Sequence, residues 1–257
     1  MASSPHLPPE LEYQIFLLTF QVDHKEAKTL ILIAKRVFDW LIPHIFNVVR
    51  LNYAQPLPTK FNEPVYQRYG KHTRHLFIQP GFGSQYLHLF PNVIDLAFWA
   101  NCNQDHIQIF LQLPLTRISI DLSPALFQIF SNSKLTHLDC LTNFYSIDEE
   151  SVASVLHPLV YLPNLTHLCV VPSTSADILE LFLDKGRCPQ LKVLIIWGSS
   201  VNDFAELNSN TWSEYEGSDP RVLHVKCDPE QNWEVGARGG VDMWEFADGV
   251  LNFSIEE

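Results

Sequence analysis

The sequence predicts an α/β fold in which an all-parallel sheet, built from repeats, follows a small helical module. A short apolar motif recurs along most of the 257 residues, at a spacing that leaves room for one strand and one return segment in each copy. The segment before the first copy lacks this motif and carries its apolar residues at helical spacing. These two patterns divide the first part of the chain into residues 1–46 and residues 47–227.

The repeated motif consists of two apolar residues on either side of one other residue. Most copies have a further apolar residue three positions earlier, and the tetrapeptide Leu-Thr-His-Leu occurs twice. Successive copies lie 20 to 30 residues apart, which is typical of leucine-rich repeats. We therefore predict a leucine-rich-repeat-like solenoid over residues 47–227. Its eight copies begin at Val49, Leu76, Leu96, Ile118, Leu138, Leu168, Leu194 and Leu223.

Helical patterns fall between several of these copies. Residues 105–113 and 124–130 place apolar side chains on one face, and residues 148–156 begin with carboxylates, which suit a helix N-terminus. Residues 174–186 start with a capping residue and end at a glycine. The alternation of strand and helix favours a parallel sheet curved into an arc. A doubly wound sheet is the alternative, but no glycine-rich turn follows the first strand.

The first 46 residues are expected to form a helical module. Apolar residues from Leu11 to Leu18 lie at helical spacing after two prolines that suit a helix start. A second helix is predicted over residues 25–39, and Pro43 limits a short third turn after it. Because so small a module buries little surface, we expect it to pack on the repeats.

The negative charge is concentrated at the C-terminal end. Residues 203–257 hold 13 acidic and 3 basic residues, whereas residues 1–202 hold 16 and 14. We expect residues 228–257 to form an acidic cap on the open end of the solenoid, with its charge either solvated or used to dock a basic partner. A net charge of −12 disfavours nucleic acid and anionic membranes as partners.

The cellular compartment is predicted from the cysteines and the N-terminus. Five widely spaced cysteines fit a reducing compartment better than a disulfide framework. The first residues lack the pattern of a secretory signal, and no apolar run approaches the length of a membrane span. We therefore expect a cytoplasmic or nuclear protein.

A further pattern near the N-terminus comprises Leu7-Pro-Pro-Glu-Leu11, Ile15-Phe16, Leu30-x-x-x-Ala34-Lys-Arg36 and Trp40. This pattern resembles the F-box, and the whole chain is similar to fungal F-box-like proteins with C-terminal leucine-rich repeats. The sequence Gln21-Val-Asp-His-Lys-Glu26 departs from the usual F-box loop between the first two helices.

The resemblance implies the substrate-recognition subunit of a Skp-cullin-F-box type ubiquitin ligase. A Skp-type adaptor would bind the N-terminal helices, and a degradation target would bind the concave face of the repeats. The alternative is a stand-alone scaffold or binding protein in which the F-box-like module only caps the repeats. The residues implied in adaptor binding are Leu7, Pro8, Leu11, Ile15 and Phe16.

Residues on either side of the core positions in each strand are expected to face the concave surface. Exposed aromatic residues there fit protein recognition, because aromatic anchors dominate binding energies. The alternative is that a return loop or the C-terminal segment covers some of them. The predicted partner-binding residues are Phe77, Trp99, Asp121, His137, Asp139, His167 and Trp197.

Four side chains of two neighbouring strands, His137, Asp139, His167 and Cys169, are expected to form a patch. Such a set could bind Zn²⁺, or could pair a cysteine nucleophile with a histidine base in a hydrolase. The alternative is a duplicated repeat whose histidines bond to neighbours or water. No cofactor motif occurs in the sequence, so we favour an interaction protein that is not an enzyme, with no catalytic residue, metal or cofactor.

Overall fold

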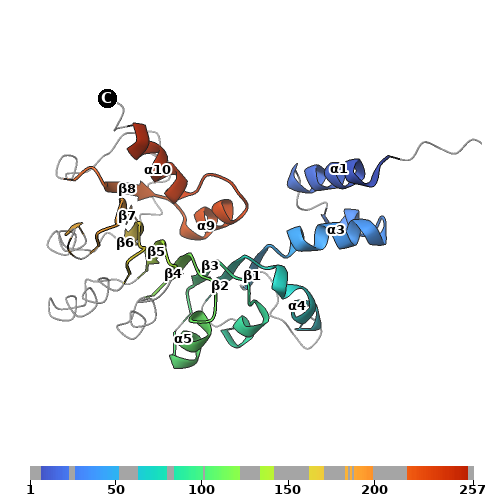
Figure 1. The fold of residues 1–257 in the computed structure, drawn as a ribbon, viewed down its shortest axis with the longest axis horizontal. Coiled ribbons are helices and arrows are strands. Elements are labelled where there is room, and N and C mark those ends of the chain that lie inside the picture. The colour runs from blue at the N-terminus through green and yellow to red at the C-terminus, as the bar shows by residue number, and fades with distance from the viewer. Residues whose placement is uncertain are drawn as a thin grey trace, which may run out of the picture.

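The computed structural model has an α/β fold with one open sheet of eight parallel strands, which follow one another in chain order (Figure 1). The strands are β1 (Val48–Leu51), β2 (His75–Ile78), β3 (Asp95–Phe98), β4 (Arg117–Ile120), β5 (His137–Cys140), β6 (His167–Val170), β7 (Val193–Gly198) and β8 (Val222–Lys226). The structure describes residues 7–22, 27–51, 63–79, 84–100, 102–121, 134–141, 162–170, 183–184, 186, 188–198 and 219–253. The parallel sheet is therefore confirmed. A doubly wound sheet, in which the strand order reverses at a switch point, does not fit this order.

Each strand coincides with a predicted copy of the apolar motif. The two apolar positions of a copy, such as Leu96 and Phe98 in β3, point to the same face and are fully buried. The apolar residue three positions before a copy is also buried, as Val93 and Leu135 illustrate. These side chains form one continuous core from β1 to β7. The alternation of apolar residues along each strand therefore determines which side chains face this core.

The described return segments between β1 and β4 lie on the face of the sheet that carries this core (Figure 1). Asn103 starts one of them, because its side chain accepts hydrogen bonds from the backbone N–H groups of Asp105 and His106, both at 3.1 Å. The helix that follows overlaps the one predicted over residues 105–113. The described helical segments on this side are α4 (Glu63–Tyr69), the 3₁₀ helices Gly70–His72 and Ser84–Leu89, and α5 (Gln104–Phe110).

Other predicted helices fall outside the described residues. This applies to the helices predicted over residues 124–130 and 148–156, and to most of the one predicted over residues 174–186. These predictions are not tested by the structure.

The N-terminal helices differ from the prediction in their boundaries. The first, α1 (Pro9–Val22), begins after Pro8 as expected. The single helix predicted after it is wrong, because the chain forms α2 (Ala27–Leu30) and α3 (Lys35–Ile45) instead. The break lies at Ala34, whose extended backbone forms the N-cap of α3. That helix continues through Pro43, which lies close to its end and disturbs only the last turn.

The last copy of the motif is displaced by one residue from its predicted register. The motif places Leu223 beside Leu194, but the backbone pairs Leu194 with Val222. Because side chains alternate along a strand, this shift turns Leu223 and Val225 to the opposite face of the sheet. They pack there with Ile195, beneath the C-terminal helices. The prediction of which side chains of β8 point to which face of the sheet is therefore wrong.

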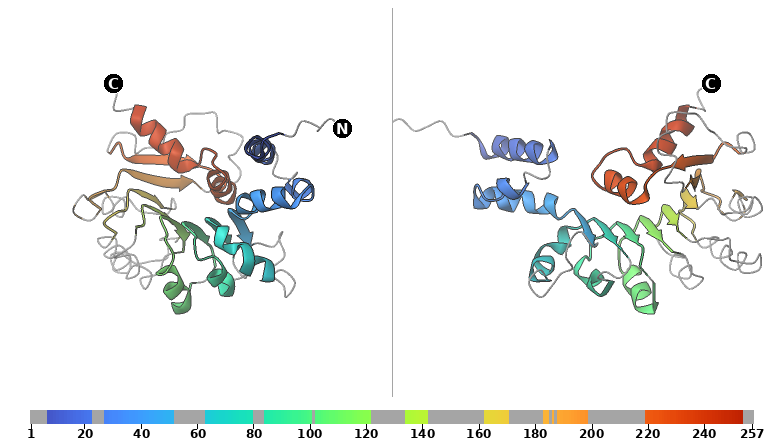
Figure 2. Two further views of the ribbon diagram at one scale, coloured as in Figure 1. Left: turned by 45° about the vertical axis from the view of Figure 1, so that its right-hand side comes forward. Right: turned by 180° about the vertical axis from the view of Figure 1, so that it is seen from behind.

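The C-terminal segment forms two helices, α9 (Pro229–Ala237) and α10 (Met243–Phe253). They lie on the face of the sheet opposite α4 and α5 (Figure 2). The sequence predicts that this segment caps the open end of the repeats, and this prediction is wrong. The segment extends across the sheet and reaches β1, where α9 forms ion pairs with Arg50.

We expect Leu96→Ala to lower the free energy of unfolding by about 3 kcal/mol, because the substitution leaves a cavity in a fully buried position. Urea denaturation measures this loss. Leu111→Ala is the matched control, since Leu111 is 52% exposed and its truncation should change stability by less than about 0.5 kcal/mol. Equal losses in the two variants would contradict the described core.

Candidate functional site

Polar contacts hold α9 to the first strands of the sheet. Arg50 of β1 forms ion pairs with both Glu230 and Glu234 of α9. Gln79, directly after β2, donates a hydrogen bond from Nε2 to Glu230 Oε2 at 3.0 Å. All of these side chains are partly shielded from water, so the contacts are screened less than surface ion pairs.

Similar contacts hold α10 to the middle strands. Arg117 Nη1 of β4 lies 2.9 Å from Asp242 Oδ2. The other oxygen of Asp242 accepts hydrogen bonds from two backbone N–H groups at the start of α10, so the same carboxylate also caps the helix. His167 Nε2 of β6 lies 3.0 Å from Asp248 Oδ1. Acidic residues of the C-terminal segment are thus directed at the protein's own sheet.

Trp233 of α9 covers β2 and β3. Its ring lies 5.4 Å from that of Phe77, which is fully buried. Trp233 Nε1 donates a hydrogen bond to Asp95 Oδ1 at 3.2 Å, and the other oxygen of Asp95 lies 3.0 Å from His75 Nδ1. The indole therefore covers an apolar residue while its N–H group is satisfied.

Trp244 of α10 covers two stacked histidines. The rings of His137 and His167 lie 4.1 Å apart at an interplanar angle of 9°. Trp244 contacts both of them edge-on, at 5.3 and 5.8 Å. Burial, together with the nearby His167 and Arg117, lowers the pKa of His137 to about 3. His137 is therefore neutral at neutral pH.

The four side chains of the predicted patch do not converge on one point. His137 and His167 stack with each other, whereas Asp139 bonds to Ser119 and to the thiol of Cys169, which lies in the apolar cluster beneath α10. Burial raises the pKa of the Cys169 thiol well above its ordinary value, so the thiolate that a nucleophile requires is disfavoured. Within the described ranges, no three His, Cys, Asp or Glu side chains are placed to hold a metal ion.

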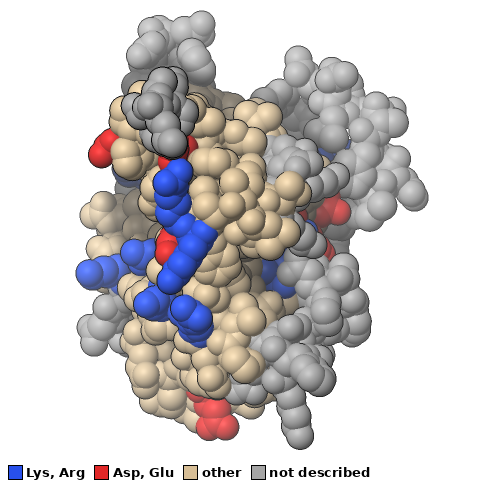
Figure 3. Space-filling view, turned by 90° about the vertical axis from the view of Figure 1, so that its right-hand side faces the viewer, with Lys and Arg blue, Asp and Glu red and all other residues tan. Residues whose placement is uncertain are grey.

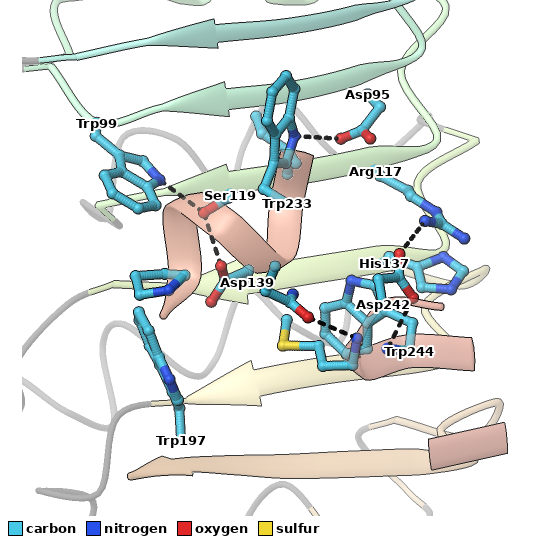
Figure 4. A pocket seen from close by; sticks show the side chains of 14 residues that line it. Asp95, Trp99, Arg117, Ser119, His137, Asp139, Trp197, Trp233, Asp242 and Trp244 are labelled. Atoms are coloured by element: carbon cyan, nitrogen blue, oxygen red, sulfur yellow. Dashed lines mark hydrogen bonds and ion pairs between the residues drawn. The ribbon is translucent and has the colours of Figure 1, made fainter. Parts of the chain in front are cut away.

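A cavity remains between the sheet and the C-terminal helices (Figure 4). Of the predicted partner-binding residues, Trp99, His137, Asp139 and Trp197 line it. The others do not. Phe77 and His167 are buried under the helices, and the exposed Asp121 lies outside the lining.

Asp139 of β5 is one of three buried acids that line this cavity, together with Asp95 and Asp242. Its Oδ2 atom accepts a hydrogen bond from Ser119 Oγ at 2.7 Å, and Ser119 Oγ accepts one from Trp99 Nε1 at 2.9 Å. Asp139 Oδ1 is buried and has no hydrogen-bond partner among the residues that the structure describes. Burial raises the pKa of Asp139 to about 6, and hydrogen bonds from Ser119 and from the Cys169 thiol oppose part of this rise.

The residues that close the cavity from above are not among the predicted site residues. Trp233, Asp242 and Trp244 belong to residues 228–257, which the sequence predicts only as a cap on the repeats. A helical signal is nevertheless present, because Met243 and Trp244 lie four and three residues before Ala247. Asp242, directly before them, is a typical N-cap residue.

No protein-family model matches the chain, and no match is found among curated proteins. None of the helices in the described ranges is long and apolar enough to cross a membrane. The function must therefore be inferred from the surfaces of the chain itself.

We expect Trp244→Ala to lower the free energy of unfolding by about 3–5 kcal/mol, because it removes a buried ring from the contact between α10 and the sheet. Phe246→Ala is the control in the same helix, since Phe246 is 49% exposed and should matter far less. Chemical denaturation compares the two variants. Unchanged stability of Trp244→Ala would show that α10 does not pack on the sheet.

The raised pKa of Asp139 predicts a pH-dependent stability. Between about pH 4 and pH 6 the folded chain keeps a proton that the unfolded chain has lost, so Asp139 makes the free energy of unfolding fall as the pH rises. Asp139→Asn removes this effect. Its stability relative to the wild type should rise by on the order of 2 kcal/mol from pH 4.5 to pH 7.

Urea denaturation of both proteins at the two pH values measures this difference. His137 titrates in both proteins, so its own contribution cancels in the comparison. A stability difference that stays constant with pH would contradict the raised pKa of Asp139.

Proposed function

We propose that the protein is an F-box-like interaction protein, not an enzyme, whose N-terminal helices bind a Skp-type adaptor and whose repeats bind a degradation target. It would then serve as the substrate-recognition subunit of a Skp-cullin-F-box type ubiquitin ligase. The observation that carries this proposal is that α1 has apolar residues on two opposite faces, of which the described residues cover only one.

The inward face of α1 packs on α2 and α3. Phe20 is buried, and Phe16 and Leu17 are half-buried, in a cluster with Val37 and Leu41 of α3. Phe16, which the resemblance implies in adaptor binding, therefore contributes mainly to the packing of the module.

The outward face of α1 carries a row of exposed apolar side chains. Their exposed fractions lie between 46% and 88%, and they recur every three or four residues along one side of the helix. A surface helix normally keeps its outward face polar, so a contiguous apolar row is typical of an interface. Leu18 and Val22 extend the F-box-like pattern along the helix. The row in α1 is Leu11, Ile15, Leu18 and Val22, and the exposed Leu7 lies just before the start of the helix.

Basic side chains lie close to this module. Figure 3 shows a band of Lys and Arg side chains on the end of the molecule that carries the N-terminal helices. Lys35 and Arg36 of α3 are exposed, and Arg36 pairs with Glu12 of α1 at 2.7 Å. An adaptor with an apolar groove and acidic groups beside it would complement this surface.

The second part of the proposal takes the eight strands as the coils of a leucine-rich-repeat-like solenoid. The chain-order parallel sheet and the motif spacing of 20 to 30 residues support it. Because the C-terminal helices cover much of the second face, the target would bind at the ends of β3 and β4. There Trp99 is half-buried and Asp121 is exposed. None of the five cysteines, all of which lie in the described ranges, forms a disulfide, which supports a cytoplasmic or nuclear location.

The alternative is a scaffold protein whose helical module only caps the repeats. In that case the outward face of α1 would be covered by the first strands. Its apolar residues are instead exposed, which favours adaptor binding.

We expect the double variant Leu11→Asp/Ile15→Asp to lose binding to a purified Skp-type adaptor while keeping its fold, because both side chains are exposed. A pull-down and a calorimetric titration measure binding, and circular dichroism checks the fold. Gln21→Asp is the control, since Gln21 is exposed on the same helix outside the apolar row. Absence of binding by the folded wild-type chain would overturn the proposal.

A further inference from the structure

We propose that the cavity between the sheet and the C-terminal helices binds an alkylammonium group, with Asp139 as its counter-ion and indole rings as its walls. This site is separate from the outward face of α1, so the inference goes beyond adaptor binding and does not depend on it. Figure 4 shows the carboxyl group of Asp139 between Trp99 and Trp197, with side chains of the C-terminal helices opposite.

Asp139 supplies the first observation, a buried acceptor with unused capacity. The residue is only 9% exposed, and its carboxyl group bonds to Ser119 and to the Cys169 thiol, but its buried Oδ1 atom meets no N–H or O–H donor in the described part of the chain. A buried carboxylate oxygen without a donor lowers stability, so a ligand that donates hydrogen bonds there gains affinity. A primary ammonium group offers three donors and the opposite charge.

The tryptophans supply the second observation. Three of the lining indoles already donate their N–H groups to the protein: Trp99 to Ser119 Oγ at 2.9 Å, Trp197 to the Cys227 carbonyl oxygen at 2.9 Å, and Trp233 to Asp95. What they can offer a ligand is therefore ring surface. Among aromatic side chains, the indole face attracts cations most strongly, and methylene groups pack on it as well.

The remaining charges of the lining favour a cation over an anion. Arg117 is paired with Asp242 at 2.9 Å, and Asp95 is held by His75 and Trp233. The third carboxylate, Asp139, forms no ion pair with any described residue of the lining and bonds to the neutral Ser119. Three carboxylates against one arginine give the lining a negative charge that an anion would have to overcome.

The size of the cavity limits the ligand. Its volume is about 30 Å³, and on this measure a water molecule needs roughly 10–15 Å³. The cavity therefore holds a group as small as an ammonium head and the methylene next to it. A slender chain that ends in a primary amine fits these dimensions, whether it belongs to a small molecule or to the lysine side chain of a protein.

Calorimetric titration with n-butylammonium chloride at constant ionic strength tests the proposal, with tryptophan fluorescence as a second signal. We expect saturable binding by the wild-type chain and no comparable binding of the neutral analogue n-butanol. Asp139→Asn should weaken binding by about tenfold or more, because the counter-ion is lost. Glu245→Gln removes the same charge from an exposed position of α10 and should bind like the wild type.

Trp99→Leu provides a second variant that removes an indole wall, and we expect it to weaken binding as well. Two capped peptides then distinguish the sources of the group, one with a single lysine and one with norleucine in its place. Selective binding of the lysine peptide assigns the cavity to a protein side chain, and binding of n-butylammonium alone assigns it to a free amine.

Three results would overturn the proposal: no binding of n-butylammonium by the wild type, equal binding of n-butanol, or unchanged affinity in folded Asp139→Asn. Adaptor binding by Asp139→Asn, measured in parallel, separates failure of this inference from failure of the proposed function.

Discussion

Phe77, Cys169 and Ile195 lie on the face of the sheet that the return segments leave open, and all three are fully buried. A parallel sheet with apolar residues on both faces has to be covered on both, because the exposed apolar area would otherwise favour association. The return segments cover one face, and α9 and α10 cover the other. The contact between the C-terminal helices and the sheet is thus the constraint on which the cavity, the buried acid and the paired histidines all depend.

This contact combines apolar and ionic parts. Met243, Trp244 and Ala247 pack on β6 to β8, and the one-residue register shift of β8 places Leu223 in the same cluster. Along the sheet, acidic side chains of α9 and of the start of α10 meet Arg50 and Arg117. The cavity lies between these two sets of contacts. Asp139 of β5 lines it, and the Oδ1 atom of this residue meets no N–H or O–H donor among the described residues.

The sequence pattern predicts those parts of the fold that local periodicity determines. Alternating apolar residues predict all eight strands, and the helical spacing over residues 105–113 predicts a helix that overlaps α5. The local signals of the C-terminal helices do not tell where these helices pack, because their partners lie far away in sequence; Arg50 and Glu234 are 184 residues apart. For the same reason, the sequence predicts only those lining residues of the cavity that belong to the strands. Trp99, His137, Asp139 and Trp197 could be predicted from their strands, whereas Trp233 and Trp244 could not.

Amide hydrogen exchange of the whole chain tests the central claim most directly. If α9 and α10 cover the second face of the sheet, their amides exchange through the same opening as those of β5 and β6, with comparable protection. Guanidinium at concentrations below unfolding should then lower the protection of helices and strands together. Exchange of α9 and α10 at nearly the rate of an unfolded chain, while the sheet stays protected, would contradict the account.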